Sequence, residues 1–397
     1  MRRVLAWALF DLANTFFAVA MLSFYFPLWV VEARGGRELS FSVALAASMV
    51  CVACLMPLCG AVSDVSGERM RFLRWTTYGC VAATALVGAT QHMGIALALF
   101  GFANVCYQLG TVFYDALLWN VASPDRLGQT SGVGASFGYL GSALGLLMLW
   151  PFVRAGGYQA AFAPSAALFL LFALPSFLLI RDAPRRAGAL PWREIARLAA
   201  LRLTVTVRSA RALGGLWRYF WAAFFSLNAI NTVLVFMGVY AKKIIGFTEA
   251  QMIPFFVFSQ MFAMAGSLSF GQMIPRWGAK RTLGWIWAGW MAALGLLAVS
   301  PASVGWLWVA GPLIGFCLGS TWATSRVLIM ELSPKDQLAE MFGLAGLFAR
   351  ASSVIGPLLW GLLVWDPSRY RLAILSLTGL LAIGLALLQR VPEPGVE

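Results

Sequence analysis

Charged and histidine side chains are scarce in this chain of 397 residues. Only 11% of the residues are charged, against about 25% in an average soluble protein, and His92 is the single histidine. One histidine in a short connection cannot supply a Ser/His/Asp set. The sequence also has no G-x-x-x-x-G-K-[ST] phosphate loop and no H-E-x-x-H pair. We therefore predict no enzymatic activity, no catalytic residue, no metal site, no cofactor and no ATP-driven transport by this chain alone.

Cysteine is also sparse, and its placement excludes an external disulfide framework. All six cysteines fall in or at the ends of apolar runs. Cys51 and Cys54 have the spacing of metal ligands, but no second pair and no histidine accompanies them, so packing is the better interpretation. The formal net charge of +13 would suggest nucleic acid for a soluble protein. Here the basic residues lie between apolar runs, and we expect no nucleic-acid partner.

Apolar residues make up 60% of the chain, and the mean hydropathy is +0.79. Runs of about 20 apolar residues recur, and each is long enough to cross a bilayer core of about 30 Å. The runs do not alternate between apolar and polar residues, which excludes a closed barrel. We predict an all-α membrane protein with twelve transmembrane helices in two pseudo-symmetric six-helix bundles. The predicted spans are 4–31, 40–62, 72–90, 94–121, 129–153, 158–180, 216–240, 249–274, 282–299, 305–332, 339–365 and 370–389.

The longest connection, 181–215, separates an N-terminal half, 1–180, from a C-terminal half, 216–397. It contains eight arginines interleaved with apolar residues. This pattern predicts a basic amphipathic helix on the anionic lipids of the inner leaflet, with a solvated linker as the alternative. Most other loop arginines and lysines fall on the same side of the predicted spans, so both termini are expected in the cytoplasm of a bacterial plasma membrane.

A charged loop occurs twice, about 211 residues apart. Residues 60–71 read GAVSDVSGERMR, and residues 271–281 read GQMIPRWGAKR. The glycines and the basic cluster repeat in register, but Pro275 stands where the first copy has Asp64. Two copies of one loop, half a chain apart, indicate a duplicated membrane unit.

The first loop resembles the signature between the second and third helices of major facilitator transporters. WALFDLANT at 7–15 resembles the first helix of the UMF1 family, the Atg22-like vacuole effluxers. YDALL at 114–118 and FGYLG at 137–141 resemble the fourth and fifth helices of that family. The resemblance implies alternating access, and it implies that Asp64 and Arg71 act in gating.

Polar side chains inside the predicted spans are the candidate substrate contacts. Asn104, Gln108, Thr111 and Asp115 follow one helical face, with Tyr107 beside it, and they line either a transport path or an interhelical hydrogen-bonded contact. The first span contains the polar pair Asp11 and Asn14, and the seventh contains Asn228 and Asn231. Each pair allows the same two interpretations, a transport path or an interhelical contact. The full predicted cavity set is Asp11, Asn14, Asn104, Tyr107, Gln108, Thr111, Asn228, Asn231, Trp322 and Arg350.

Asp11, Asp115, Arg326 and Arg350 lie within the predicted spans and are candidates for function by default. Asp11 and Asp115 come from the first half, and Arg326 and Arg350 from the second. Asp115 and Arg326 occupy equivalent repeat positions, so we predict that they form an inner gate; structural ion pairing is the alternative. Carboxylates and guanidinium groups together suit a zwitterion, and the carboxylates also offer a route for coupling to protons.

The sequence thus predicts a secondary transporter of a small solute, with efflux of amino-acid-like zwitterions as the leading hypothesis. Export of amphiphilic drugs or lipids is an alternative, because 17 tryptophans and 15 methionines would suit an apolar pocket. A membrane sensor or scaffold that retains the fold without turnover is a further alternative.

Overall fold

The computed structural model describes residues 2–35, 38–182, 213–241, 245–299, 303–363 and 370–393. All regular secondary structure within these ranges is helical. The first transmembrane segment begins as α1 (Arg2–Phe17) and continues through two wide π-helical turns and the short α2 (Tyr25–Leu28) to Ala33. The remaining long helices are α3 (Glu38–Ser66), α4 (Arg69–Ala89), α5 (Met93–Val121), α6 (Leu127–Gly156), α7 (Phe162–Leu179), α9 (Gly214–Tyr240), α10 (Glu249–Trp277), α11 (Ala279–Val299), α12 (Val304–Leu332), α13 (Leu338–Leu363) and α14 (Tyr370–Gln389).

Counting the first segment once, the described residues form twelve long helices. Nine of them are long and apolar enough to cross a bilayer by length and composition alone. The protein is an integral, multi-pass, all-helical membrane protein, and this confirms the predicted fold. The predicted connection 181–215 falls mostly outside the described residues, so its amphipathic helix and the two domain boundaries stay predictions.

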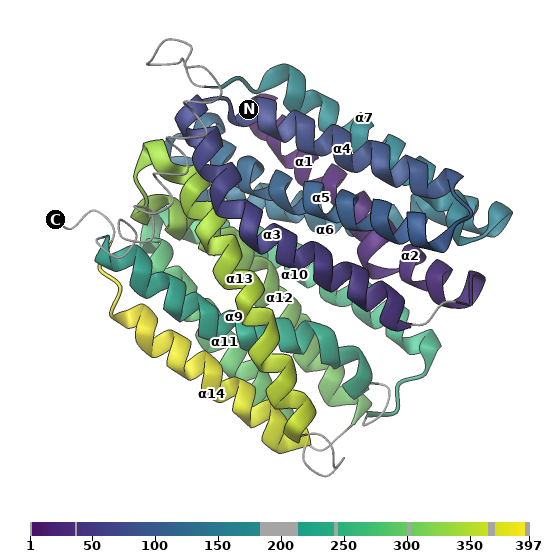
Figure 1. The fold of residues 1–397 in the computed structure, drawn as a ribbon. Helices are drawn as coiled ribbons and strands as arrows, with labels where there is room; N and C mark the ends of the chain where they lie inside the picture. The colour runs from purple at the N-terminus through teal and green to yellow at the C-terminus, as the bar shows by residue number, and fades with distance from the viewer. Residues whose placement is uncertain are drawn as a thin grey trace. The chain divides into compact units, whose positions relative to one another are not determined.

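The helices pack into two compact units (Figure 1). One unit comprises residues 1–124, 137–205 and 335–344, and the other comprises 125–136, 206–334 and 345–397. Two helices therefore change units along their length. The first turns of α6 belong to the second unit, and the first turns of α13 belong to the first unit.

Aromatic packing holds the first unit together. α1 packs along α7, and α4 packs against both α5 and α7. The Trp7 ring stacks on Tyr114 of α5 with centroids 4.4 Å apart, and the Trp7 indole N–H donates to the Tyr114 carbonyl at 3.0 Å. Buried in this way, the indole gains its apolar contact area while its single donor remains satisfied.

Close glycine contacts hold the second unit together. α10 packs along α12, and α14 packs against α9 and α11. Gly266, Gly315 and Gly319 each bring one backbone of the α10–α12 pair against the other, where an added Cβ would meet a carbonyl group. Small residues permit such close helix approach in a membrane, where packing replaces the hydrophobic effect as the driving force.

Candidate functional site

The loop at 60–71 is built by its glycines. Gly67 has a φ of 68°, a left-handed conformation that ends α3 and lets α4 begin at Arg69. Its amide donates to the Ser63 carbonyl at 3.0 Å. At Gly60, an added Cβ would collide with the backbone of Ala339, so only glycine allows α3 to approach the start of α13 this closely.

Asp64 is the centre of this site. Its side chain is fully buried, and its Oδ1 accepts hydrogen bonds from Arg69 Nε at 2.9 Å and Arg69 Nη2 at 2.7 Å. Its Oδ2 accepts from the backbone N–H of Glu340 at 2.8 Å. Glu340 lies in the first turn of α13, where the helix dipole also favours a negative charge. One carboxylate therefore joins a loop arginine to the amino end of a distant helix.

The two arginines of this loop make different contacts, and the gating role predicted for Arg71 stays a prediction. Arg71 pairs with Glu68 at 2.9 Å on the surface, with 53% of its side chain exposed. Arg69 makes the contacts to Asp64 and also donates to the Lys335 carbonyl at 3.3 Å. Both arginines follow Gly67, and the left-handed turn there decides which of them points back to the carboxylate. Nothing in the sequence indicates that the backbone N–H of Glu340 donates to Asp64.

The second copy of the loop repeats this geometry about 211 residues later. Gly278 has a φ of 78°, matching Gly67, and it separates α10 from α11 as Gly67 separates α3 from α4. Gly271 meets the Gly128 carbonyl of α6, as Gly60 meets Ala339 of α13. The predicted duplication is thus visible at the level of individual contacts.

The predicted cavity residues of the first unit lie on α1 and α5. Asn104 is fully buried and donates to Ser48 Oγ of α3 at 2.7 Å, and Gln108 donates to the Asn104 side-chain oxygen at 3.4 Å. These contacts support the interhelical interpretation for this pair. The Thr111 hydroxyl donates within its own helix, to the Gln108 carbonyl, and the Tyr107 ring packs 4.8 Å from that of Phe17.

Asp11 and Asn14 occupy successive turns of α1. Asp11 is half-buried, and its carboxyl group lies against Gly138 of α6, where an added Cβ would be 3.4 Å from the carboxyl carbon. Asn14 is 7% exposed. Asp115 is half-buried on α5, four residues beyond Thr111. The absence of a side chain at Gly138 lets α6 pack closely beside the Asp11 carboxyl group.

The remaining candidates lie in the second unit. Asn228 donates to the Phe224 carbonyl of its own helix at 2.8 Å, and Asn231 donates to Ser352 Oγ of α13 at 3.4 Å. Arg326 is half-buried on α12 and donates to Ser131 Oγ of α6 at 3.4 Å. Arg350 is half-buried near the middle of α13, and Trp322 is 37% exposed. Because Asp115 and Arg326 belong to different units, their pairing stays a prediction.

Comparisons with known proteins agree on the transporter class. The model of the family described as vacuole effluxer Atg22 like matches residues 38–394. The chain is 24% identical to the MFS-type transporter YxiO of Bacillus subtilis, over 98% of this chain and 94% of that protein. It is 20% identical to autophagy-related protein 22 of Kluyveromyces lactis, over 90% and 79% of the two chains.

Solved structures share the fold at low sequence identity. The human organic anion transporter MFSD10 matches with a TM-score of 0.72 and 17% identity, over 98% of both chains. A bacterial homologue of the iron transporter ferroportin, in its outward-facing state, matches with a TM-score of 0.76 and 16% identity over the same share. These likenesses establish the major facilitator fold and leave the solute open.

Proposed function

Because the chain belongs to the family of Atg22-like vacuole effluxers and is an MFS-type transporter, we propose that it exports small zwitterionic solutes of the amino-acid kind by alternating access. Transporters of this class bind a solute near the middle of the membrane and expose it to each side in turn. The proposed membrane is a bacterial plasma membrane, with both termini in the cytoplasm. The family's description as effluxers supports the outward direction.

The observation that carries the choice of solute is the division of charge between the two units. Asp11 and Asp115 are half-buried on α1 and α5 of one unit, and Arg326 and Arg350 are half-buried on α12 and α13 of the other. Ionisable residues within spans are rare and commonly mark a solute or ion pathway. A zwitterion presents an ammonium group for a carboxylate and a carboxylate for a guanidinium group.

Proton coupling extends the proposal. A carboxylate that loses water when a cavity closes binds its proton more tightly, and rehydration releases the proton. Asp11 is a candidate for such a change because its half-buried carboxyl group lies on α1 within the first span, packed beside Gly138 of α6. An imposed pH gradient should then drive solute movement in proteoliposomes, and a proton ionophore should abolish that movement.

Substitutions at Arg350 directly test whether the protein binds a zwitterionic solute. The experiment measures solute binding and proteoliposome flux for Arg350→Ala and Arg350→Lys, with Arg218→Lys as a control at an exposed arginine that donates to the Arg390 backbone carbonyl. We expect Arg350→Ala to weaken binding about tenfold or more, because the solute carboxylate loses a charge-assisted partner worth about 1.5–3 kcal/mol. Lysine should restore part of the affinity, because it keeps the charge without the planar fork.

Two outcomes would contradict this function. Wild-type affinity in Arg350→Ala would remove Arg350 from the binding site. Flux of hydrophobic cations or lipids with no flux of any zwitterion would favour the exporter of amphiphiles instead. Absence of all flux, together with partner binding by the 181–215 connection, would favour a sensor or scaffold.

A further inference from the structure

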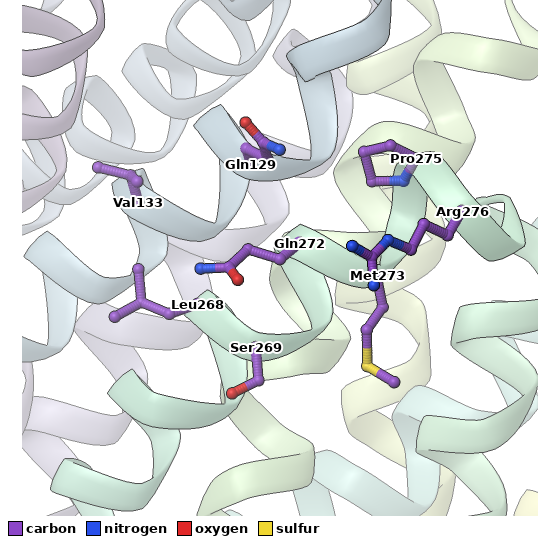
Figure 2. A pocket seen from close by; sticks show the side chains of 8 residues that line it. All are labelled: Gln129, Val133, Leu268, Ser269, Gln272, Met273, Pro275 and Arg276. Atoms are coloured by element: carbon purple, nitrogen blue, oxygen red, sulfur yellow. The ribbon is translucent and has the colours of Figure 1, made fainter.

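A groove of about 650 Å³ opens between the start of α6 and the end of α10 in the second unit. Gln129 and Val133 line it from α6, and the other lining residues come from the last three turns of α10 (Figure 2). Ser269, Gln272 and Arg276 follow one face of α10 at the spacing i, i+3, i+7. Two amide side chains, a hydroxyl and a guanidinium group thus surround one opening.

Arg276 differs from the other basic residues of the two repeated loops. Arg69 pairs with Asp64, Arg71 with Glu68, and both Lys280 and Arg281 with Glu393. Arg276 is exposed, and among the described residues no acidic group pairs with it. In Figure 2 its guanidinium group reaches back along α10 toward Gln272. The groove therefore presents a positive charge that the described part of the protein does not neutralise.

The internal repeat shows what the groove lacks. In the first copy, the Asp64 carboxylate accepts from the Glu340 amide in the first turn of α13. The equivalent turn of α6 contains Gln129, and the residue in the place of Asp64 is Pro275. The proline side chain supplies no hydrogen-bond acceptor. The backbones nevertheless meet as in the first copy, with Gly271 of α10 against Gly128 of α6. One copy carries an anion of its own at this junction, and the other carries an open groove with an arginine.

We propose that this groove binds a phosphate-type oxyanion, which occupies the place that the Asp64 carboxylate fills in the other repeat. The planar Arg276 guanidinium group suits phosphate oxygens through paired N–H donors. The Gln129 and Gln272 amides and the Ser269 hydroxyl add donors around it. The amino end of α6 contributes a favourable dipole on the same side. The site is separate from the proposed solute site and does not depend on which solute is transported.

The oxyanion has two available sources. The groove lies at the end of α10 that the basic-residue pattern assigns to the inner membrane surface, so the phosphodiester of an anionic inner-leaflet lipid can reach it. Free phosphate in the cytoplasm offers the same chemistry without acyl chains. The experiment therefore uses both: inorganic phosphate, and phosphatidylglycerol with phosphatidylcholine as the zwitterionic comparison.

The test measures the thermal midpoint of the full-length, delipidated protein in a non-ionic detergent as each probe is titrated. A ligand that binds only the folded state raises the midpoint, and the stabilisation grows as RT ln(1 + [L]/Kd). Arg276→Gln removes the charge from the groove. Arg281→Gln removes an equal charge nearby but outside the groove, because Arg281 pairs with Glu393. Pro275→Asp restores the carboxylate of the other repeat.

We expect wild type and Arg281→Gln to respond to the oxyanion, and Arg276→Gln to need about tenfold more of it for the same rise in midpoint. Pro275→Asp should lose the response because its own carboxylate repels the ligand. A response to phosphatidylglycerol alone assigns the site to lipid, and a response to inorganic phosphate as well assigns it to any phosphate oxyanion. The proposal is overturned if the wild type responds to neither probe, or if Arg276→Gln and Arg281→Gln respond equally.

Discussion

Asp64 illustrates how one residue can link segments that are far apart in sequence. Its carboxylate bonds Arg69 five residues later and the Glu340 amide 276 residues later. The side chain is fully buried, so the two contacts replace its hydration. Separation of α3 from α13 would break the hydrogen bond from the Glu340 amide. The Asp64 carboxylate would then have to be hydrated by water. Asp64 is therefore suited to control a conformational step without touching the solute.

Replacement of Asp64 by asparagine should separate the transport rate from solute binding. The amide keeps one acceptor but loses the charge, which weakens a charge-assisted contact worth about 1.5–3 kcal/mol. We expect the rate of exchange in proteoliposomes to change by about tenfold, while equilibrium binding stays within about threefold. Asp125→Asn is the matched control, because its pair with Arg126 is exposed and worth about 0–1 kcal/mol. Loss of binding with a normal exchange rate would refute the role.

Asp182 makes a second carboxylate contact at an amino end of a helix. It lies beyond α7, outside the spans, and its Oδ1 accepts from the Met70 amide at 2.9 Å. Burial raises the pKa of Asp182 above its ordinary value, and the Met70 amide and Arg69 oppose part of that rise. Because the folded pKa lies above the unfolded one, the protonated form contributes stability fully below a pH of about 3.9. That contribution is lost as the pH rises through the folded pKa.

The neutral variant Asp182→Asn should therefore be more stable than wild type at pH 7, by roughly a few degrees in the thermal midpoint. The difference should shrink as the pH falls toward 4, because wild type then becomes neutral too. Asp125→Asn serves as the control at an exposed carboxylate, because the Asp125 side chain is 72% exposed. A stability gain for Asp182→Asn that grows on acidification would contradict the direction of the pKa shift.

At the scale of elements, two pairs of helices repeat one crossing. Gly60 and Gly343 bring α3 against the first turns of α13, and Gly271 and Gly132 bring α10 against the first turns of α6. In each crossing the glycines let backbone meet backbone. The two crossings differ in chemistry, because only the first contains a carboxylate. The duplication has kept the packing and changed the polar contacts.

A methyl group at the second crossing should force the two helices apart. In Gly132→Ala the new Cβ would meet the Ser267 carbonyl and would lie 3.2 Å from Gly271 Cα. We expect a loss of about 1–3 kcal/mol, measured as a lower thermal midpoint in detergent. Gly295→Ala on α11 has nothing within 4 Å of its new Cβ, so it should be neutral or gain up to about 1 kcal/mol. Equal effects of the two variants would show that the crossing tolerates expansion.

At the scale of the whole molecule, the distribution of basic residues predicts the orientation in the membrane. His92 is exposed in the connection between α4 and α5, on the predicted outer side. Asp125 is exposed between α5 and α6, on the predicted inner side. In a background without native cysteines, an impermeant maleimide should label His92→Cys in intact cells. It should label Asp125→Cys only after permeabilisation, and the reverse pattern would invert the topology.

The sequence by itself determined the approximate spans and the repeated loop with its glycines in register. These features are local: an apolar run must match the bilayer thickness, and a left-handed turn requires a residue such as Gly67 or Gly278. The family resemblance was equally available from short motifs, and the family match confirms it. Span edges therefore fall within a few residues of the helices in the structure.

Only the tertiary structure decided which polar groups meet. The sequence could not show that Arg69, and not Arg71, holds Asp64, because the turn at Gly67 sets the direction of each side chain. It could not show that Asn104 bonds Ser48, because a polar stripe suits a cavity and an interhelical contact equally. The groove beside Pro275 could not be predicted from the sequence either, because it forms only where α6 packs against α10. Hydrophobic length is a property of one segment, whereas a hydrogen bond between distant helices depends on how both are packed.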